Sequence, residues 1–507
     1  MKQQVDTFIY NAVILTQSET MPVATSMAIH NGKILALFQQ DEPPPYQAKN
    51  RIDAKKKIIM PGLIDTHCHL QAMISEQSSI HLPKSLQSKE DLFSYLRKQI
   101  ASIPDGEWVR INGYHPFHFA HLDALSMEML DEISINHPIR VRYLTRHTSV
   151  LNSKGWHYFQ QALIKHSEAG IHVEQDTTGK PTGIIHGADA LLNEFVLPKV
   201  SEKQWLEGIQ SLQTKLLSLG ITTLCDASTT TSSAQLAIWK KAAQQFWKIP
   251  VQWMTGAPHF NELLDILQPI SIFKRGALKI VLETIPEIYP NKETMIQMIR
   301  QAFLANSPVA IHVVTVEMVL HALDALQTVR QQLPHINGIC RFEHLSLCPD
   351  ALFNMIHEQH VQVVTNPPFI YVHGDRYLQQ VDEGEHNWLY PVNSLLKQGI
   401  TVSAGADAPV APISPWLGIY AACTRQSKNG FQVNIREAVS REDALRLYTT
   451  NAALVIGEQL RIGQLAPGFD ANFIVLHHHP INCSPTQLQN MKVLETWIHG
   501  ERLYHYS

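Results

Sequence analysis

The sequence predicts an α/β fold in which a TIM (β/α)8 barrel carries a small β-sandwich domain built from both termini and an inserted subdomain. Three observations support this prediction. The chain has 507 residues, which is too long for one small domain and suits a large barrel with attachments. Apolar strand-like runs alternate with amphipathic helical stretches through the middle of the chain. Both ends instead show short alternating strands joined by tight turns.

The β-sandwich domain is predicted from residues 1–57 and 456–507. In the first segment, Asn31-Gly32 lies between two apolar runs and is a strong hairpin signal. The last segment has the same alternating character, with another turn at His499-Gly500. Because these two β-rich ends flank a long middle, we expect them to fold together as one domain.

The barrel is predicted from residues 58–74 and 206–455. Eight strand-like runs occur there in βα order, at 62–65, 221–227, 251–256, 277–283, 309–314, 341–346, 361–366 and 401–407. The stretch between the first two runs is far too long for a βα loop and has helical and strand signals of its own. We therefore expect residues 75–205 to form an inserted subdomain between barrel strands one and two.

The composition excludes several classes of protein. Hydrophobic residues make up 45% of the chain and charged residues 17%, which is typical of a folded protein with a sizeable core. The net charge of -4 provides no basic field for nucleic acid or anionic lipid. Six cysteines without a CxxC pair do not form a disulfide framework. With no apolar run long enough for a signal peptide or a membrane span, we expect a cytoplasmic protein.

A pair of histidines follows the first barrel strand. His67 and His69 are two residues apart on an extended segment, so both imidazoles point to the same side. Neutral imidazole is a good ligand for zinc and similar metals. Taken alone such a pair is more often structural, but this one lies where the strand reaches the C-terminal rim of the barrel, which is where TIM-barrel active sites occur.

Three later strand ends supply further candidate ligands. His312 lies among β-branched residues on the fifth strand, and His344 lies on the sixth. Asp407 closes the eighth strand, where a carboxylate is costly unless it is paired, hydrogen-bonded or bound to a metal. A hydrogen-bonded core histidine is the alternative for His312. Together with His67 and His69, these residues predict one metal site at one end of the barrel.

Lys279 lies in the middle of an apolar run on the fourth strand. A buried lysine readily loses its proton, and the free amine could react with carbon dioxide to give a carbamate that bridges two metals. The alternative is a lysine paired with a carboxylate such as Glu283 or Asp407. Both interpretations stay open at this point.

The chain resembles the amidohydrolase superfamily and, within it, the YtcJ-like group that includes N-substituted formamide deformylases. The resemblance covers almost the whole chain. It rests on PGLIDTHCHL (61–70), WVRINGYHP (108–116), RHTSVLNS (146–153), GKPTGII (179–185), GALKIVLE (276–283), IHVVTVEMVLHALDAL (311–326), RFEHLSL (341–347), AGADAPVAPISPWLGIYAACTR (404–425) and ALRLYTTNAALVIGEQLRIGQLAPGFDANFIVL (444–476).

This resemblance implies a role for six residues of the barrel and one of the insertion. The metal-site residues would be His67, His69, His312, His344 and Asp407, with Lys279 as the strand-four lysine. His147 stands at the histidine position of the group's motif in the inserted subdomain. Several positions depart from the pattern of the group, namely Glu283-Thr284 after the lysine, Gly187, Ala406 and Asn366-Pro367. The metal shell is retained, whereas the substrate-facing positions differ.

The predicted activity is metal-dependent hydrolysis of an amide-like C–N bond, of the N-substituted amide or formamide type. We expect one or two divalent ions, zinc first, with a carboxylated Lys279 as a candidate bridging group. Asp407 would transfer the proton, and His147 would donate a hydrogen bond to the substrate, although it could equally be a structural loop residue. Phe369 and Trp416 are candidate walls of an apolar substrate pocket, with simple packing as the alternative.

Three competing hypotheses remain. The first is a deaminase or cyclic-amide hydrolase on the same scaffold, which an unmodified Lys279 and a single metal would favour. The second is a catalytically inactive protein that binds a metal or ligand. The third is that the inserted subdomain serves mainly for contacts between subunits. The partner we expect is a small-molecule substrate, not nucleic acid or membrane, and the assembly we consider is a homodimer.

Overall fold

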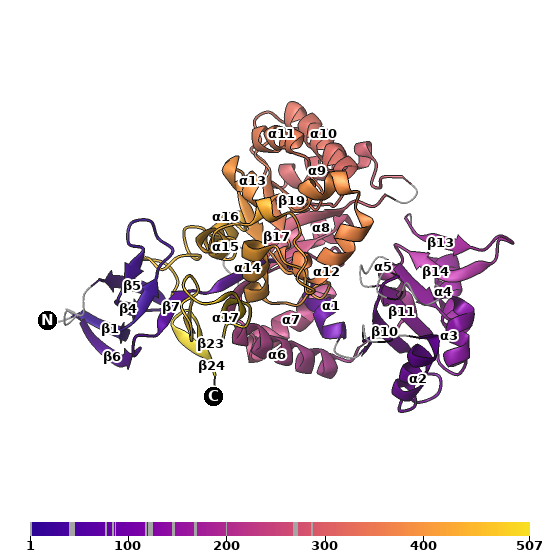
Figure 1. Cartoon of the computed structure of the whole chain (residues 1–507), viewed down its shortest axis with the longest axis horizontal. Coiled ribbons are helices and arrows are strands. Elements are labelled where there is room, and N and C mark those ends of the chain that lie inside the picture. Colours follow the sequence, from indigo (N-terminus) through magenta and orange to yellow (C-terminus); the bar gives the residue numbers. More distant parts are fainter. Residues whose placement is uncertain are drawn as a thin grey trace. The chain divides into compact units, whose positions relative to one another are not determined.

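The computed structural model describes most of the chain and divides it into two compact units. The first unit comprises Met1–Leu70 and Ile209–Ser507, and the second comprises Gln71–Gly208 (Figure 1). The described residues are 3–39, 46–76, 79–83, 86, 88–116, 119, 125–143, 148–166, 170–198, 200–266, 272–284 and 287–506.

The first unit contains the predicted barrel. Eight strands lie in the order β21-β20-β19-β18-β17-β16-β15-β8, and the paired strands are parallel. Past the end of β21, an isolated parallel bridge joins Cys68 to Ala408 and nearly closes the barrel. The TIM barrel is therefore confirmed. The strands are β8 (Leu63–Cys68), β15 (Ile221–Asp226), β16 (Val251–Thr255), β17 (Phe273–Val281), β18 (Val309–Val313), β19 (Cys340–His344), β20 (Gln362–Thr365) and β21 (Val402–Ala404).

Amphipathic helices surround this barrel and bury their apolar faces against it. Side-chain caps fix where several of them begin, for example Asn291 before α9 and Thr315 before α10. Helices α9, α10 and α11 lie together outside the barrel (Figure 1). The helices are α6 (Glu202–Ser218), α7 (Ser233–Gln245), α8 (Ala257–Ile266), α9 (Lys292–Leu304), α10 (Val316–Gln332), α11 (Phe353–Glu358), α12 (Pro367–Gln380), α13 (Val392–Lys397), α14 (Pro415–Thr424), α15 (Arg441–Arg446) and α16 (Thr450–Val455).

The two chain ends form the expected β-sandwich within the first unit. One sheet has the order β5-β4-β1-β6 and the other β24-β23-β22-β7-β2-β3. The termini meet where β7 pairs antiparallel with β22, with Pro61 opposite Phe473. Side chains of both sheets share one core, including Met27, Phe473 and Trp497. The strands are β1 (Gln3–Tyr10), β2 (Val13–Leu15), β3 (Val23–Ala24), β4 (Ser26–His30), β5 (Lys33–Phe38), β6 (Tyr46–Asp53), β7 (Ile58–Pro61), β22 (Phe473–Leu476), β23 (Val493–Ile498) and β24 (Glu501–His505).

The second unit has a sheet and a core of its own. Its strand order is β13-β14-β12-β11-β10-β9, and α2 and α3 pack their buried faces on the central strands. Among the described residues, no helix of either unit is both long and apolar enough to cross a bilayer. The elements are β9 (Ile80–His81), α2 (Lys89–Ile100), β10 (Val109–Tyr114), α3 (Met127–Ile133), β11 (Ile139–Tyr143), β12 (Thr148–Leu151), α4 (Ser153–Lys165), β13 (His172–Gln175) and β14 (Pro181–His186).

Candidate metal centre

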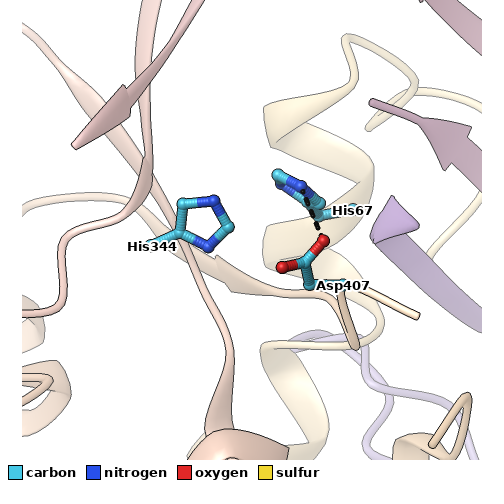
Figure 2. A group of neighbouring side chains, drawn as sticks. All are labelled: His67, His344 and Asp407. Atoms are coloured by element: carbon cyan, nitrogen blue, oxygen red, sulfur yellow. Dashed lines mark ion pairs between the residues drawn. The ribbon is translucent and has the colours of Figure 1, made fainter. Parts of the chain in front are cut away.

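Three buried side chains converge at the C-terminal ends of barrel strands. His67 comes from β8, His344 from β19, and Asp407 from the segment after β21. One ligand atom of each lies within 4.8 Å of the others. Figure 2 shows the two imidazole rings and the carboxylate facing one another. Two imidazoles and a carboxylate are a donor set that suits zinc.

The other two predicted histidines border this group. His69 Nε2 lies 2.9 Å from Asp407 Oδ1, and His67 Nε2 lies 3.4 Å from the same oxygen. The ring of His312 lies 4.5 Å from the ring of His344, centroid to centroid. The five residues proposed from four separate strands therefore form one continuous cluster.

Hydrogen bonds on the outer side of the cluster orient the rings. His344 Nδ1 lies 2.6 Å from Asn366 Oδ1, and the amide nitrogen of Asn366 donates to the Gly405 carbonyl, so Oδ1 must accept from the ring. His69 Nδ1 lies 3.2 Å from the Ser228 hydroxyl, and His67 Nδ1 contacts Glu343. In each of these three rings Nδ1 contacts a residue on the outer side of the cluster. Nε2 is therefore the nitrogen available to a metal.

Burial gives two of these histidines the protonation state of a ligand. It lowers the pKa of His344 to about 3, with the charge of His67 acting in the same direction. Burial also lowers the pKa of His69, against the opposing effect of Asp407. Neutral imidazoles are the form that binds a cation.

Partners outweigh burial in setting the pKa of Asp407 and of His67. Burial alone would raise the pKa of Asp407, but hydrogen bonds from His67 and His69 outweigh it and hold that pKa well below its usual value. Burial and the charge of Lys279 would lower the pKa of His67, but Glu343 and Asp407 outweigh them and raise that pKa. The carboxylate is therefore ionised, which is the form that binds a cation.

Lys279 is buried on β17 with an exposed fraction of 3%. Within the described part of the chain, its Nζ has no hydrogen-bond partner. Burial lowers its pKa, while Glu343 and Asp407 act in the opposite direction. A buried amine without a hydrogen-bond partner fits a metal beside it or a carbamate formed on it by carbon dioxide.

The backbone is strained where the strands deliver these side chains. His344 has φ of 73° and Asp407 has φ of 52°, a left-handed conformation that is uncommon for such residues. Hydrogen bonds hold the second of these turns: Asp407 N donates to the His67 carbonyl at 2.7 Å, and Ala406 N donates to Asp65 Oδ2 at 3.0 Å. Asp65 also accepts from His67 N and so joins the first and eighth strands.

The candidate substrate-binding residues have different surroundings. Phe369 on α12 is 8% exposed, and its ring lies parallel to that of His344 at 6.3 Å between centroids. Trp416 on α14 is 1% exposed inside the main hydrophobic core, where its surroundings are those of a packing residue. His147 lies outside the described residues.

Sequence reasoning assigned no role to several polar residues that the structure places around the cluster. They are Asp65, Asp226, Ser228, Arg341, Glu343 and Asn366. One signal was present: Arg341 and Glu343 are charged residues two apart on a predicted strand, which places both on one face. Their further partners, Thr66 and His67, lie on the first strand, so those contacts could not be deduced from spacing.

The chain is similar to known proteins over most of its length. The amidohydrolase family model matches residues 51–504. The chain is 26% identical to an N-substituted formamide deformylase of Arthrobacter pascens over 99% of both chains. It is 24% identical to the putative amidohydrolase YtcJ of Bacillus subtilis over 89% of both. Its fold is similar to that of an uncharacterized metal-dependent hydrolase from Pyrococcus horikoshii, with a TM-score of 0.73, 21% identity, and coverage of 95% of this chain and 99% of that one.

Proposed function

We propose that this chain, which belongs to the amidohydrolase family, cleaves the C–N bond of an N-substituted amide or formamide. That it is a metal-dependent hydrolase acting on carbon–nitrogen bonds follows from the family. The similarity of the chain to the formamide deformylase supports N-substituted amides or formamides as the substrate class. The observation that carries the proposal is the convergence of His67, His344 and Asp407 at one end of the barrel.

The donor set fits a divalent ion, and zinc is the leading candidate. His67, His69, His312 and His344 would hold it through imidazole nitrogens, with Asp407 as the carboxylate ligand. When bound, such an ion polarises a carbonyl and lowers the pKa of water toward neutrality. The hydrogen-bond-free Nζ of Lys279 supports a carbamate and a second ion at the same site.

The residues of the chain then supply proton transfer and orientation. Water adds to the substrate carbonyl carbon, and Asp407 accepts the proton that the water gives up. Asp407 returns that proton to the departing nitrogen as the C–N bond breaks, which yields a carboxylic acid and an amine. Its position beside His67 and His69, the histidines that would hold the ion, supports this role.

Two further residues complete the proposal. Phe369, beside the ring of His344, would provide an apolar wall for the substituent of the substrate. His147 would donate a hydrogen bond to the substrate carbonyl. We also propose the domain limits given by the sequence, with the insertion at 75–205.

The proposal is tested with zinc-loaded protein on a panel of N-substituted formamides, with amine release as the readout. We expect turnover that is lost in His344→Ala and retained in Asp105→Asn, whose side chain is 77% exposed. Release of ammonia from amino-heterocycles, with no formamide cleavage, would instead establish a deaminase. Zinc binding without turnover on either panel or on cyclic amides would indicate an inactive ligand-binding protein.

A further inference from the structure

A charged pair lies inside the barrel, where charge is expensive. Arg341 and Glu343 are two residues apart on β19 and point to the same face, and both are almost completely buried. Removing two such charges from water costs more than their attraction returns, unless further hydrogen bonds satisfy them. The other contacts of the pair therefore indicate what it does.

Those contacts lead to the first barrel strand. Arg341 Nε donates to Glu343 Oε1 at 2.5 Å, and Arg341 Nη2 donates to the Thr66 carbonyl at 2.9 Å. Glu343 Oε2 contacts His67 Nδ1. The pair thus reaches the backbone just before His67 and the ring of His67 at the same time.

The partners of ring nitrogen Nδ1 differ among His67, His69 and His344. His69 has the hydroxyl of Ser228 as its partner, and His344 has the amide of Asn366. His67 alone has a carboxylate, and that carboxylate is itself held by a guanidinium. A carboxylate partner fixes the ring tautomer and makes the imidazole a stronger electron donor.

We propose that Arg341 and Glu343 form a positioning pair for His67. The pair holds the His67 ring with Nε2 toward Asp407 and makes His67 a stronger donor than His69 or His344. This inference rests on the metal centre of the proposed function. Glu343 acts through His67, and Arg341 acts through Glu343 and the Thr66 carbonyl, so neither is assigned as a ligand.

The experiment measures zinc affinity of the metal-free full-length chain by competition with a chelator, and the visible spectrum of the cobalt-loaded chain. Glu343→Gln keeps the shape of the side chain and removes its charge. We expect zinc affinity to fall about 10–100-fold, and the cobalt spectrum to change because one donor is weaker. The matched control is Glu458→Gln, which removes a carboxylate held by Lys274 and Arg461 away from the site. The control should keep the affinity and the spectrum of wild type.

Glu343→Asp provides the second variant, since it keeps a charge for Arg341 and shortens the reach to His67. We expect this variant to fold and to lose zinc affinity as well, even if Glu343→Gln does not fold. Wild-type affinity and spectrum in either folded variant would overturn the inference while leaving the proposed function intact. A wild-type chain that binds neither zinc nor cobalt would instead overturn the proposed function, and the inference with it.

Discussion

Asp407 combines an ionised carboxylate with a left-handed backbone and two imidazole partners. Such strain persists only where the surroundings hold it, and here the His67 carbonyl and Asp65 do so. The sequence predicted Asp407 as a candidate because a carboxylate at a buried strand end needs a partner. It could not predict which atoms meet, because these depend on side chains from the first, sixth and eighth strands.

Replacement of Asp407 by Asn tests its role in proton transfer. The amide keeps the shape of the side chain but cannot accept the proton, so we expect turnover to fall about 10²–10⁴-fold. Bound zinc should remain, because four histidines are left. Turnover and metal content of the same preparation are the measurements, and near-wild-type turnover would contradict the role.

The lowered pKa of His344 predicts how the stability of the metal-free protein changes in acid. Its pKa is about 3 in the folded chain and 6.5 as the unperturbed value, so the unfolded state binds the proton more readily. The stability that this group contributes is present above pH 6.5 and is lost as the pH falls toward 3. Between pH 6 and 4, we expect the unfolding free energy to decline more steeply for wild type than for His344→Gln, by at most about 1.4 kcal/mol per pH unit. Parallel curves from denaturant titrations would contradict this.

At the scale of elements, the site depends on how closely β8 approaches β21. A Cβ added to Gly405 would lie 2.4 Å from His67 N and 2.8 Å from His67 Cα. Glycine is therefore required for strands one and eight to place His67 and Asp407 together. The alternation of apolar strands and helices predicted these elements, but this close contact is a property of the closed barrel and has no signal in local sequence.

Gly405→Ala should separate these two strands. We expect a loss of about 1–3 kcal/mol in unfolding free energy, together with weaker zinc binding, because His67 must move. Gly384→Ala is the control, since a Cβ there meets no heavy atom within 4 Å. Chemical denaturation and zinc titration of both variants provide the comparison, and equal behaviour would exclude the proposed constraint.

At the scale of the whole molecule, the two chain ends complete one domain beside the barrel. β7 leads through Gly62 into β8, so the sheet that joins the termini directly precedes the strand carrying His67. The alternating pattern predicted this shared domain. The pairing of Pro61 with Phe473, residues far apart in the sequence, follows from the fold. The second unit, Gln71–Gly208, forms a separate compact body.

Trp497→Ala tests the contribution of this shared domain to stability. The indole stacks on Phe473 at 5.1 Å within the sandwich core, so we expect a loss of about 3–5 kcal/mol. Zinc affinity of the folded fraction should not change, because no candidate ligand is touched. Leu460→Ala, at a side chain that is 85% exposed, should have little effect. A stability loss in both variants, or in neither, would argue against the sandwich core.

The most direct test of the metal centre is the metal content per chain, measured by elemental analysis after zinc reconstitution and removal of free ions. Wild type should retain about one or two zinc ions per chain, and the double variant His67→Ala/His344→Ala should retain almost none. A folded wild-type chain without stoichiometric metal, or a double variant with the wild-type content, would contradict the assignment of this cluster as the site of hydrolysis.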